Sequence, residues 1–273
     1  MNEPFVNVTI PVYNEEKELT ASVRQVVKFL KTRLCYPCEI VIANNGSTDA
    51  TQAIAEGLSR RYAEVRLVSL PQSGRGRAIK KVWSESHADI LSYMDVDLST
   101  DLNSFPPLIE ALLSGGCAVA TGSRRLSDSC ANRGLGREFL SSCYHVMLKA
   151  LFHTQISDAQ CGFKAITKKA ATELLPLVVD NGWLMDTELL VLAERLGYRI
   201  FDLPVRWVED TDSRVKVGRD AVAAIKGLFR LRRNLARGKY GHIQPAKSEG
   251  LCTASRISPR RARGLQVPVG HIS

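Results

Sequence analysis

The sequence predicts an α/β protein with a single mixed, mostly parallel sheet flanked by helices. Apolar runs rich in β-branched residues alternate with segments of helical periodicity through residues 5–94. Strands that alternate with helices in this way pair in parallel through right-handed crossovers. A chain of 273 residues with 45% hydrophobic content is long enough to bury the core that such a sheet needs.

The first half is expected to contain four strands separated by helices. The strands are predicted at residues 5–13, 39–43, 65–70 and 89–94. Between them, amphipathic helices are expected to end near Leu34 and Tyr62, and a third helix contains Ile79, Val82 and Trp83. The turns after these strands are polar or rich in glycine, which suits loops that bind a ligand.

The second half follows a less regular order. Helices are predicted at about residues 103–114, 137–153 and 189–196, and strands at residues 117–124 and 200–208. The piece at 158–165 is short and mixes polar with apolar residues. A basic amphipathic helix is expected over residues 218–237, with Val222, Ile225 and Phe229 on one face and Lys and Arg side chains on another.

The chain has a formal net charge of +9, but residues 1–213 are slightly acidic. All of the excess positive charge therefore lies beyond residue 213. A nucleic-acid-binding fold would spread its basic face through the body, so nucleic acid is not an expected partner. Residues 238–273 are rich in Pro, Ser and Arg and are expected to be disordered. The absence of P-loop and dinucleotide fingerprints argues against an NTPase or a dehydrogenase.

Two carboxylates, Asp95 and Asp97, follow directly on the fourth predicted strand. The carboxyl end of a strand in an open α/β sheet is where ligands bind. Two hard oxygen ligands there suit a Mg²⁺ or Mn²⁺ ion that takes part of its shell from substrate phosphates. The stretch by itself is equally compatible with a strand that stops in a polar turn, with Asp101 capping the next helix.

A set of motifs follows in a fixed order along the chain. They lie at residues 11–15, 45–49, 74–76, 95–99, 122–124 and 158–164. In this order they resemble the family 2 glycosyltransferases with the GT-A fold, and within them the polyprenyl-phosphate (dolichyl-phosphate) glucose and mannose synthases. The resemblance covers roughly residues 5–218 and implies that Asp95 and Asp97 bind the metal.

The resemblance also implies a donor site built from the first strands and the loops that follow them. Pro11, Tyr13 and Glu15 are expected to contact the base and ribose of a nucleotide sugar. The rest of the expected donor site is Asn44, Ser47, Gly74, Arg75, Gly76 and Asp95.

The turn after the second strand departs from the family pattern. Family members usually have aspartate where this chain has Asn44, and often where it has Asn45. An amide still donates and accepts hydrogen bonds, but the carboxylate charge is lost. The change leaves open which nucleotide is recognised, and it motivates the alternative of a non-catalytic nucleotide-sugar-binding homologue. A neutral exchange in a polar turn is the plainer interpretation.

The acceptor decides whether a catalytic base is needed. A lipid phosphate, with a second pKa of about 6, is already an oxyanion at neutral pH and needs cations that position it. The acceptor-phosphate site that the resemblance implies consists of Arg124, Arg137, Ser141, Arg214 and Lys216. Each cation taken singly is also compatible with an ordinary surface residue.

Asp186 is the third expected catalytic residue, with Asp95 and Asp97. It lies where hydroxyl-using members of the wider family place a general base, so it would serve as the base for a glycan or another hydroxyl acceptor. With a phosphate acceptor it would instead orient the acceptor loop. Capping of the helix that follows is the alternative without a catalytic role.

The resulting hypothesis is metal-dependent, inverting transfer of a hexose to a polyprenyl phosphate. Glucose from UDP-glucose is the preferred donor, and mannose from GDP-mannose is the alternative. A GT-A domain is expected over residues 1–217, with a nucleotide-sugar half at 1–101 and an acceptor half at 102–217.

A polyprenyl phosphate lies in a bilayer, yet no run approaches the roughly 18 apolar residues of a membrane span. The N-terminus also lacks the pattern of a signal peptide. The chain is therefore expected in the cytoplasm, attached peripherally to the cytoplasmic face of a membrane through residues 218–237, whose cations attract anionic headgroups. The alternative is an ordinary C-terminal helix packed on the core with a solvated basic face.

Overall fold

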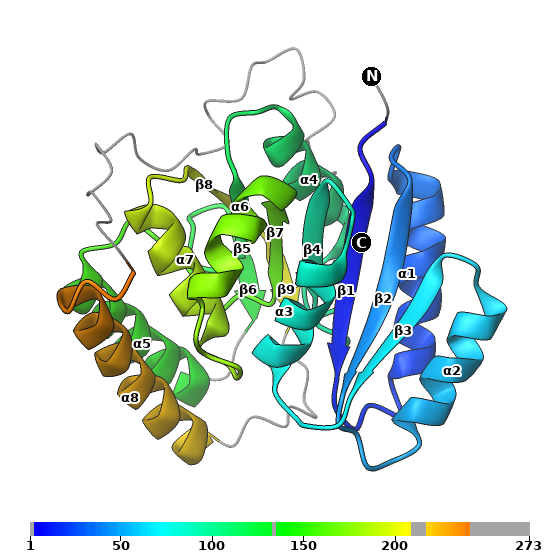
Figure 1. Ribbon diagram of the computed structural model, residues 1–273, viewed down its shortest axis with the longest axis horizontal. Helices are drawn as coiled ribbons and strands as arrows, with labels where there is room; N and C mark the ends of the chain where they lie inside the picture. The colour runs from blue at the N-terminus through cyan, green and yellow to red at the C-terminus, as the bar shows by residue number, and fades with distance from the viewer. Residues whose placement is uncertain (1–2, 133–134, 209–216, 241–273) are drawn as a thin grey trace, which may run out of the picture.

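The computed structural model describes residues 3–132, 135–208 and 217–240. Its centre is a seven-stranded sheet with the order β3-β2-β1-β4-β7-β5-β8, and β6 pairs separately with β9. Helices cover both faces of the large sheet (Figure 1). The predicted α/β class, with a mixed and mostly parallel sheet, is confirmed.

The first half alternates between strands and helices as predicted. The strands are β1 (Val6–Val12), β2 (Cys38–Asn45), β3 (Val65–Leu70) and β4 (Ile90–Met94), and the helices are α1 (Leu19–Arg33), α2 (Thr51–Arg61) and α3 (Arg75–Glu85). Every residue of β1 and β4 is buried. Parallel strands covered by helices on both sides are apolar on both faces, which explains the continuous apolar runs in the sequence.

The strand order determines which edge of the sheet is expected to bind ligands. From β1 the chain crosses to β2 and β3 on one side, and it returns to β4 on the other side of β1. These four strands run parallel, so the loops that follow β1, β2 and β4 meet at one edge of the sheet. The reversal between β1 and β4 is the topological switch point at which open α/β sheets bind ligands.

Strand β7 (Phe163–Thr167) is absent from the sequence-based prediction. It lies antiparallel between β4 and β5 (Val119–Ser123). Four of its five residues are buried, and one of them is Lys164. A lysine inside a central strand breaks the apolar pattern by which strands are recognised, because its burial depends on partners from other elements.

The strand predicted at residues 200–208 is divided in two. β8 (Ile200–Pro204) belongs to the large sheet, whereas β9 (Arg206–Val208) pairs with β6 (Cys130–Asn132). Val205 separates them, and its N–H donates to the Ser123 carbonyl at the end of β5. A segment predicted as one strand therefore contributes to two sheets.

Helix α7 (Met185–Arg195) begins before the predicted start at Leu189. Its first turn contains Asp186 and Glu188, whose polar character is typical of a loop in the sequence although both are buried. The remaining elements are η1 (Leu102–Ser104), α4 (Phe105–Leu113), α5 (Leu135–Phe152), α6 (Lys168–Leu174), η2 (Leu175–Leu177) and α8 (Val217–Ala236).

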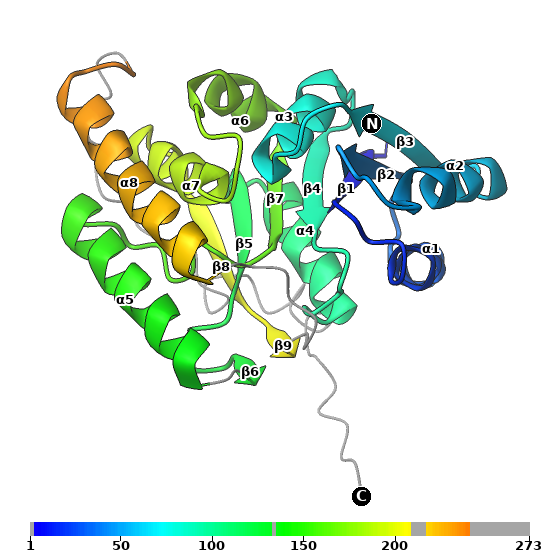
Figure 2. The ribbon, with the colours of Figure 1, turned by 90° about the horizontal axis from the view of Figure 1, so that it is seen from below.

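Helix α8 lies beside α5, on the side of the molecule away from α2 (Figure 2). Leu228 and Leu231 are fully buried and pack α8 on the core. Val222, Ile225 and Phe229 are exposed at 53%, 40% and 55%. The helix therefore has one apolar strip against the core and a second that faces outward. Within the described ranges, no helix has both the length and the apolar character that a membrane span requires.

Some predictions fall outside the described residues. These are the expected acceptor-phosphate residues Arg214 and Lys216, and the expected disorder beyond residue 240. Residues 238–240 form a turn, in which the Tyr240 hydroxyl donates to Glu188 Oε1 over 3.2 Å. The boundary of a domain at residue 217 and its two halves stay predictions.

Candidate active site

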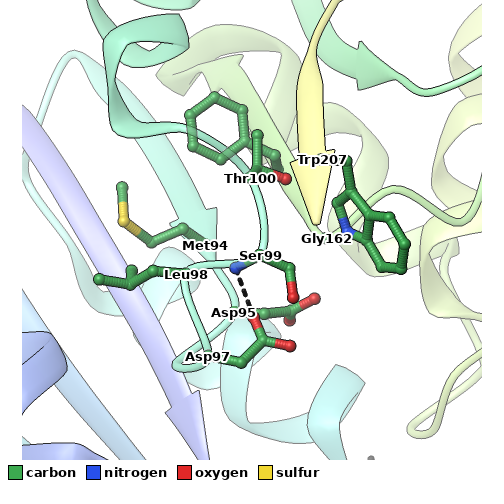
Figure 3. A pocket seen from close by; sticks show the side chains of 9 residues that line it. Met94, Asp95, Asp97, Leu98, Ser99, Thr100, Gly162 and Trp207 are labelled. Atoms are coloured by element: carbon green, nitrogen blue, oxygen red, sulfur yellow. Dashed lines mark hydrogen bonds between the residues drawn. The ribbon is translucent and has the colours of Figure 1, made fainter. Parts of the chain in front are cut away.

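Asp95 and Asp97 lie on the loop that follows β4, at the ligand-binding edge of the sheet (Figure 3). Both line one small pocket, together with Ser99 and Gly162. The Ser99 N–H donates to Asp97 Oδ1 over 3.0 Å, and the intervening Leu98 has a left-handed φ of 50°. A tight turn therefore brings the predicted carboxylate pair to one place.

Gly162 determines where the Asp95 carboxylate can lie. The Asp95 N–H donates to the Gly162 carbonyl over 3.2 Å. A Cβ atom at residue 162 would lie 1.6 Å from Asp95 Oδ2 and 2.4 Å from Asp95 Cγ. Any side chain here would displace the carboxylate, so the glycine of the motif at 158–164 is a steric requirement of the site.

Arg75, predicted as a donor-binding residue, connects two of the predicted catalytic carboxylates. Its Nη2 donates to Asp95 Oδ1 over 2.7 Å, and its Nη1 donates to Asp186 Oδ2 over 2.6 Å. The guanidinium lies 4.7 Å from the ring centre of Tyr93 and 5.1 Å from that of Trp183. Burial alone would lower the pKa of Arg75, but the charge of Asp95, with Tyr93 and Asp186, raises it well above its ordinary value.

The Asp186 carboxylate is buried, with 3% of the residue exposed. Besides the bond from Arg75, it accepts a hydrogen bond from the Tyr93 hydroxyl, and the Lys164 ammonium lies 3.6 Å from its Oδ1. Burial would raise the pKa of Asp186, but the positive charges of Lys164 and Arg75 lower it below its usual range. The helix cap is Leu184, so Asp186 does not cap α7.

Lys164 and Tyr93 are site residues that the sequence-based prediction missed. Lys164 is 1% exposed and donates to the Tyr93 hydroxyl and to the Cys161 carbonyl. With Asp186, Arg75 and Asp95 it forms a chain of alternating charges that is buried from Lys164 to Arg75 and reaches solvent at Asp95. The sequence signal was present, because a lysine inside an apolar strand needs a buried counter-charge. The sequence alone does not indicate which carboxylate supplies it.

The two amides that replace the usual aspartates are both buried and both used as donors and acceptors. Asn45 donates to the Val12 carbonyl over 2.8 Å and accepts from the Gly74 N–H over 3.0 Å. Asn44 donates to Gln52 Oε1 over 2.6 Å and accepts from the Ser47 N–H over 3.2 Å. An ionised carboxylate has no hydrogen to donate, so the two bonds that Asn44 and Asn45 donate require the amides.

The other predicted donor residues lie around the same edge. Pro11 is buried in β1 opposite Ala43 of β2, and the Tyr13 side chain is 42% exposed just after the strand. The Glu15 N–H donates to Thr51 Oγ1 over 2.7 Å. The Ser47 hydroxyl accepts from the Asn14 N–H over 2.9 Å, and Asn14 is left-handed at φ 56°. These bonds join the loops after β1 and β2.

Arg124, predicted to bind the acceptor phosphate, is held by Asp158. Its Nε donates to Asp158 Oδ2 over 2.6 Å and its Nη2 donates to Oδ1 over 3.0 Å, and the guanidinium lies over the Trp207 ring. Burial would raise the pKa of Asp158, but the Arg124 charge lowers it to about 2. With 13% of its side chain exposed, Arg124 is no ordinary surface cation.

The structure tests the rest of the predicted acceptor site only partly. Ser141 is half-buried on α5. Arg137 belongs to the same helix, but its side chain is not described, and Arg214 and Lys216 lie outside the described residues. Their assignment to the acceptor phosphate stays a prediction.

The oxygen atoms at this edge fit a divalent cation that shares its shell with a phosphate. Asp95 and Asp97 offer the carboxylate ligands that Mg²⁺ and Mn²⁺ prefer. The Asp95 side chain is 38% exposed and thus open to a ligand. In the part of the chain that the structure describes, no cluster of three or more metal-binding side chains exists. A bound ion would therefore take further ligands from substrate or water.

Comparison with known proteins identifies the family. Residues 7–175 match the model of Glycosyl transferase family 2. The glycosyltransferase AglD of Haloferax volcanii is 36% identical over 217 residues, which make up 79% of this chain but 35% of that protein. The dolichyl-phosphate beta-glucosyltransferase ALG5C of Trichomonas vaginalis is 30% identical over 227 residues, covering 79% of this chain and 67% of that protein.

A solved structure shows the same fold. Glucosyl-3-phosphoglycerate synthase from Mycobacterium tuberculosis, in complex with Mn²⁺, UDP and phosphoglyceric acid, superposes with a TM-score of 0.64 over 84% of this chain and 78% of that chain. The two are 22% identical, so the likeness concerns the fold, and it confirms the predicted GT-A fold. With this fold and the match over residues 7–175, the chain belongs to glycosyl transferase family 2.

Proposed function

We propose that this protein transfers a hexose from a nucleotide sugar to a polyprenyl phosphate, with inversion at the anomeric carbon. The observation that carries the proposal is the arrangement at the switch point of the sheet. There Asp95 and Asp97 lie beside Arg75, while the neighbouring Asp186 carboxylate is buried and bonded. Relatives named dolichyl-phosphate beta-glucosyltransferases support glucose and a lipid phosphate as the substrates.

Asp95 and Asp97 would hold a Mg²⁺ or Mn²⁺ ion. When bound, this ion supplies the positive charge that stabilises the departing nucleoside diphosphate. Solved complexes of glucosyl-3-phosphoglycerate synthase with UDP and Mn²⁺ or Mg²⁺ support the choice of ions. Gly162 leaves the Asp95 carboxylate the space it needs at the pocket.

The loops after β1 and β2 would bind the nucleotide, with Tyr13 exposed at the rim. Asn44 and Asn45 keep these loops and the Gly74 turn together, so the replacement of aspartate is compatible with an active enzyme. UDP-glucose is the proposed donor. GDP-mannose is the competing donor that the assay has to exclude.

A phosphate acceptor explains why the site needs no free base. The acceptor oxygen is already charged at neutral pH, so the protein has to position it and keep water out. Arg124 is fixed by Asp158 and would contribute a preoriented cation, together with Arg137, Ser141, Arg214 and Lys216. Asp186 would then orient Arg75 and take no proton from the acceptor.

A transfer assay tests this proposal. The protein is incubated with UDP-glucose or GDP-mannose, Mn²⁺, and either a short-chain polyprenyl phosphate or the matching polyprenol. Glucose on the phosphate alone is expected. Transfer from GDP-mannose alone would overturn the donor, and transfer to the polyprenol or to a glycan would overturn the acceptor. No transfer from any donor would support the non-catalytic alternative.

The variant Asp186→Asn separates a base from a positioning residue. Loss of a general base lowers turnover by about 10²- to 10⁴-fold and leaves donor binding intact. Because both Asp186 oxygens are bonded to Arg75 and Tyr93, we expect weaker UDP binding as well. Calorimetric titration with UDP and Mn²⁺ measures this, and unchanged UDP affinity with lost turnover would restore Asp186 as a base for a hydroxyl acceptor.

We propose that the protein reaches its lipid acceptor at the cytoplasmic face of a membrane. The exposed strip of Val222, Ile225 and Phe229 would insert between headgroups, since it is not used in packing. Cations on the same helix would interact with anionic lipids, each by about 1 kcal/mol. Because α8 also packs on the core, a chain truncated before α8 would expose buried residues, so point variants are the sounder test.

A further inference from the structure

Helix α8 contacts the segment that precedes α7 and carries Trp183. Arg230 Nη2 of α8 lies 2.7 Å from Asp180 Oδ2, in an ion pair whose side chains are 35% and 17% exposed. One turn earlier, α8 passes so close to Leu184 that a Cβ at Gly227 would lie 2.4 Å from Leu184 Cδ2. The outer helix is thus fixed to residues 180–184 by a charge pair and by close packing.

Asp180 is in turn connected to the turn that follows it and to α7. Its Oδ1 accepts from the Gly182 N–H over 2.8 Å, and its own N–H donates to Glu188 Oε2 over 2.7 Å. Glu188 is fully buried, and its Oε2 lies 3.9 Å from Arg230 Nη2. Arg230 therefore balances two carboxylates, one of which has no access to solvent.

The other side of segment 180–184 contacts the beginning of α3. The Asn181 carbonyl accepts from the Arg77 N–H over 3.1 Å. A Cβ at Gly74 would lie 2.7 Å from that carbonyl oxygen, and a Cβ at Gly76 would lie 2.9 Å from the Gly182 oxygen. The glycines on both sides of Arg75 thus allow this close approach.

Trp183 completes the connection to the site. Its ring centre lies 5.1 Å from the Arg75 guanidinium, on which Asp95 and Asp186 also converge. More than half of Trp183, 53%, remains exposed. The position of segment 180–184 therefore determines the surroundings of Arg75.

We propose that Arg230 is a positioning residue of the active site, which acts through Asp180 and segment 180–184 on Trp183 and Arg75. The sequence alone places Arg230 on the basic face of the helix, directed at headgroups or at solvent, whereas in the structure it pairs with Asp180. Since α8 also carries the exposed strip of Val222, Ile225 and Phe229, the proposed membrane-facing helix is part of the support of the donor site. This inference rests on the proposed function for its turnover readout, but not for its binding readout.

The test compares Arg230→Gln with a matched control, Arg232→Gln. Both remove one positive charge from α8, but Arg232 Nη1 donates to the Leu151 carbonyl of α5 over 3.4 Å, and Arg232 makes no ion pair among the described residues. The affinity for UDP with Mn²⁺ is measured by calorimetry, and kcat and KM for UDP-glucose are measured with a short-chain polyprenyl phosphate. We expect Arg230→Gln to weaken UDP binding and raise the donor KM by about tenfold, with Arg232→Gln within about twofold of wild type.

A double-mutant cycle with Asp180→Asn shows whether the effect passes through the ion pair. Arg230→Gln and Asp180→Asn are expected to weaken UDP binding to a similar degree, and the double variant no further. Additive effects, or the same UDP affinity in Arg230→Gln and Arg232→Gln, would overturn the proposal. If no donor supports transfer, the proposed function fails while UDP affinity still tests Arg230. Urea unfolding of each variant confirms that binding is compared between folded proteins.

Discussion

Asp95 lies between a glycine that leaves room for its carboxylate and an arginine that holds the carboxylate in place. Arg75 bonds Asp95 Oδ1, and Oδ2 lies over the Cα of Gly162. A carboxylate that Arg75 holds in place loses little freedom when it binds an ion. The site therefore requires a glycine at position 162 as well as the side chains of Asp95 and Arg75.

The variant Gly162→Ala tests this dependence. The added methyl group would overlap Asp95 Oδ2, so we expect the affinity for Mn²⁺ with UDP to fall by at least about tenfold. Gly57→Ala is the matched control, because a Cβ at Gly57 meets no atom within 4 Å. Titration calorimetry measures both proteins, and wild-type affinity in Gly162→Ala would show that Asp95 does not bind the ion.

Asp202 on β8 makes the stability of the fold depend on pH. It is 2% exposed, its Oδ2 accepts from the Ser157 N–H over 3.0 Å, and its Oδ1 is buried without a hydrogen bond among the described residues. Burial raises the pKa of Asp202 to about 6. The folded protein thus holds this proton more tightly than the unfolded chain, so the stability that depends on Asp202 is fully present below about pH 4 and is lost as the pH rises through 6.

We expect Asp202→Asn to remove this loss of stability. The amide oxygen still accepts from Ser157, and no charge has to be buried, so the variant should exceed wild type by about 2 to 3 kcal/mol in free energy of unfolding at pH 7.5. At pH 4 the two should be nearly equal. Urea unfolding at both pH values measures the difference, with exposed Asp128→Asn as the control that keeps the wild-type pH dependence.

At the scale of elements, α8 shows how one helix serves two surfaces. Leu228 and Leu231 are fully buried, whereas Phe229, next to them in sequence, is 55% exposed. Neighbouring residues on a helix point about 100° apart, so adjacent side chains face different environments. From the sequence, a membrane-facing helix and a core-packed helix are alternatives. The two do not exclude each other, because α8 packs on the core and also has an exposed apolar strip.

Two variants of α8 are expected to affect different properties, one the stability of the fold and the other the binding to membranes. Leu228→Ala should cost about 2 to 5 kcal/mol in free energy of unfolding, because it leaves a cavity in the core. Phe229→Ser should leave stability within about 0.5 kcal/mol, but weaken binding to vesicles that contain anionic lipid by about tenfold. Urea unfolding and vesicle flotation measure the two effects. Wild-type flotation by Phe229→Ser would argue against the membrane contact.

At the scale of the whole molecule, the chain divides the site between its two halves. The loops after β1, β2 and β4 come from the first half, and Gly162, Lys164 and Asp186 come from the second. Arg75 and Asp186 are 111 positions apart in sequence yet share a hydrogen bond of 2.6 Å. A ligand that joins both halves should therefore stabilise the entire fold.

Thermal unfolding with UDP and Mn²⁺ measures this linkage. A ligand at about 100 times its Kd stabilises the folded state by about 2.7 kcal/mol. For a domain of this size, that corresponds to a rise in Tm of about 5 to 10 °C. The rise should require the metal and disappear in Asp97→Ala. A shift with GDP in place of UDP, or one that Asp97→Ala retains, would contradict the proposed donor or the metal site.

The sequence by itself determined the alternating half of the fold and the family. Hydrophobic periodicity is a local property, so the strands and helices through β4 were predictable, as was the place of Asp95 and Asp97 at a strand end. The ordered motifs were enough to identify glycosyl transferase family 2. The glycine-rich turn at Gly74 and Gly76 was a weak signal by itself, and only the resemblance to the family assigned these residues to the donor site.

Only the tertiary structure decided how the buried charges are paired. Lys164, Asp186 and Arg75 are far apart in the sequence, and each has a polar side chain that alone predicts a loop or a surface. Their burial is favourable only when the partners are present, and β7 and the start of α7 were missed for this reason. The same holds for Arg230, since a cation on a helix shows its partner only when the helix is packed.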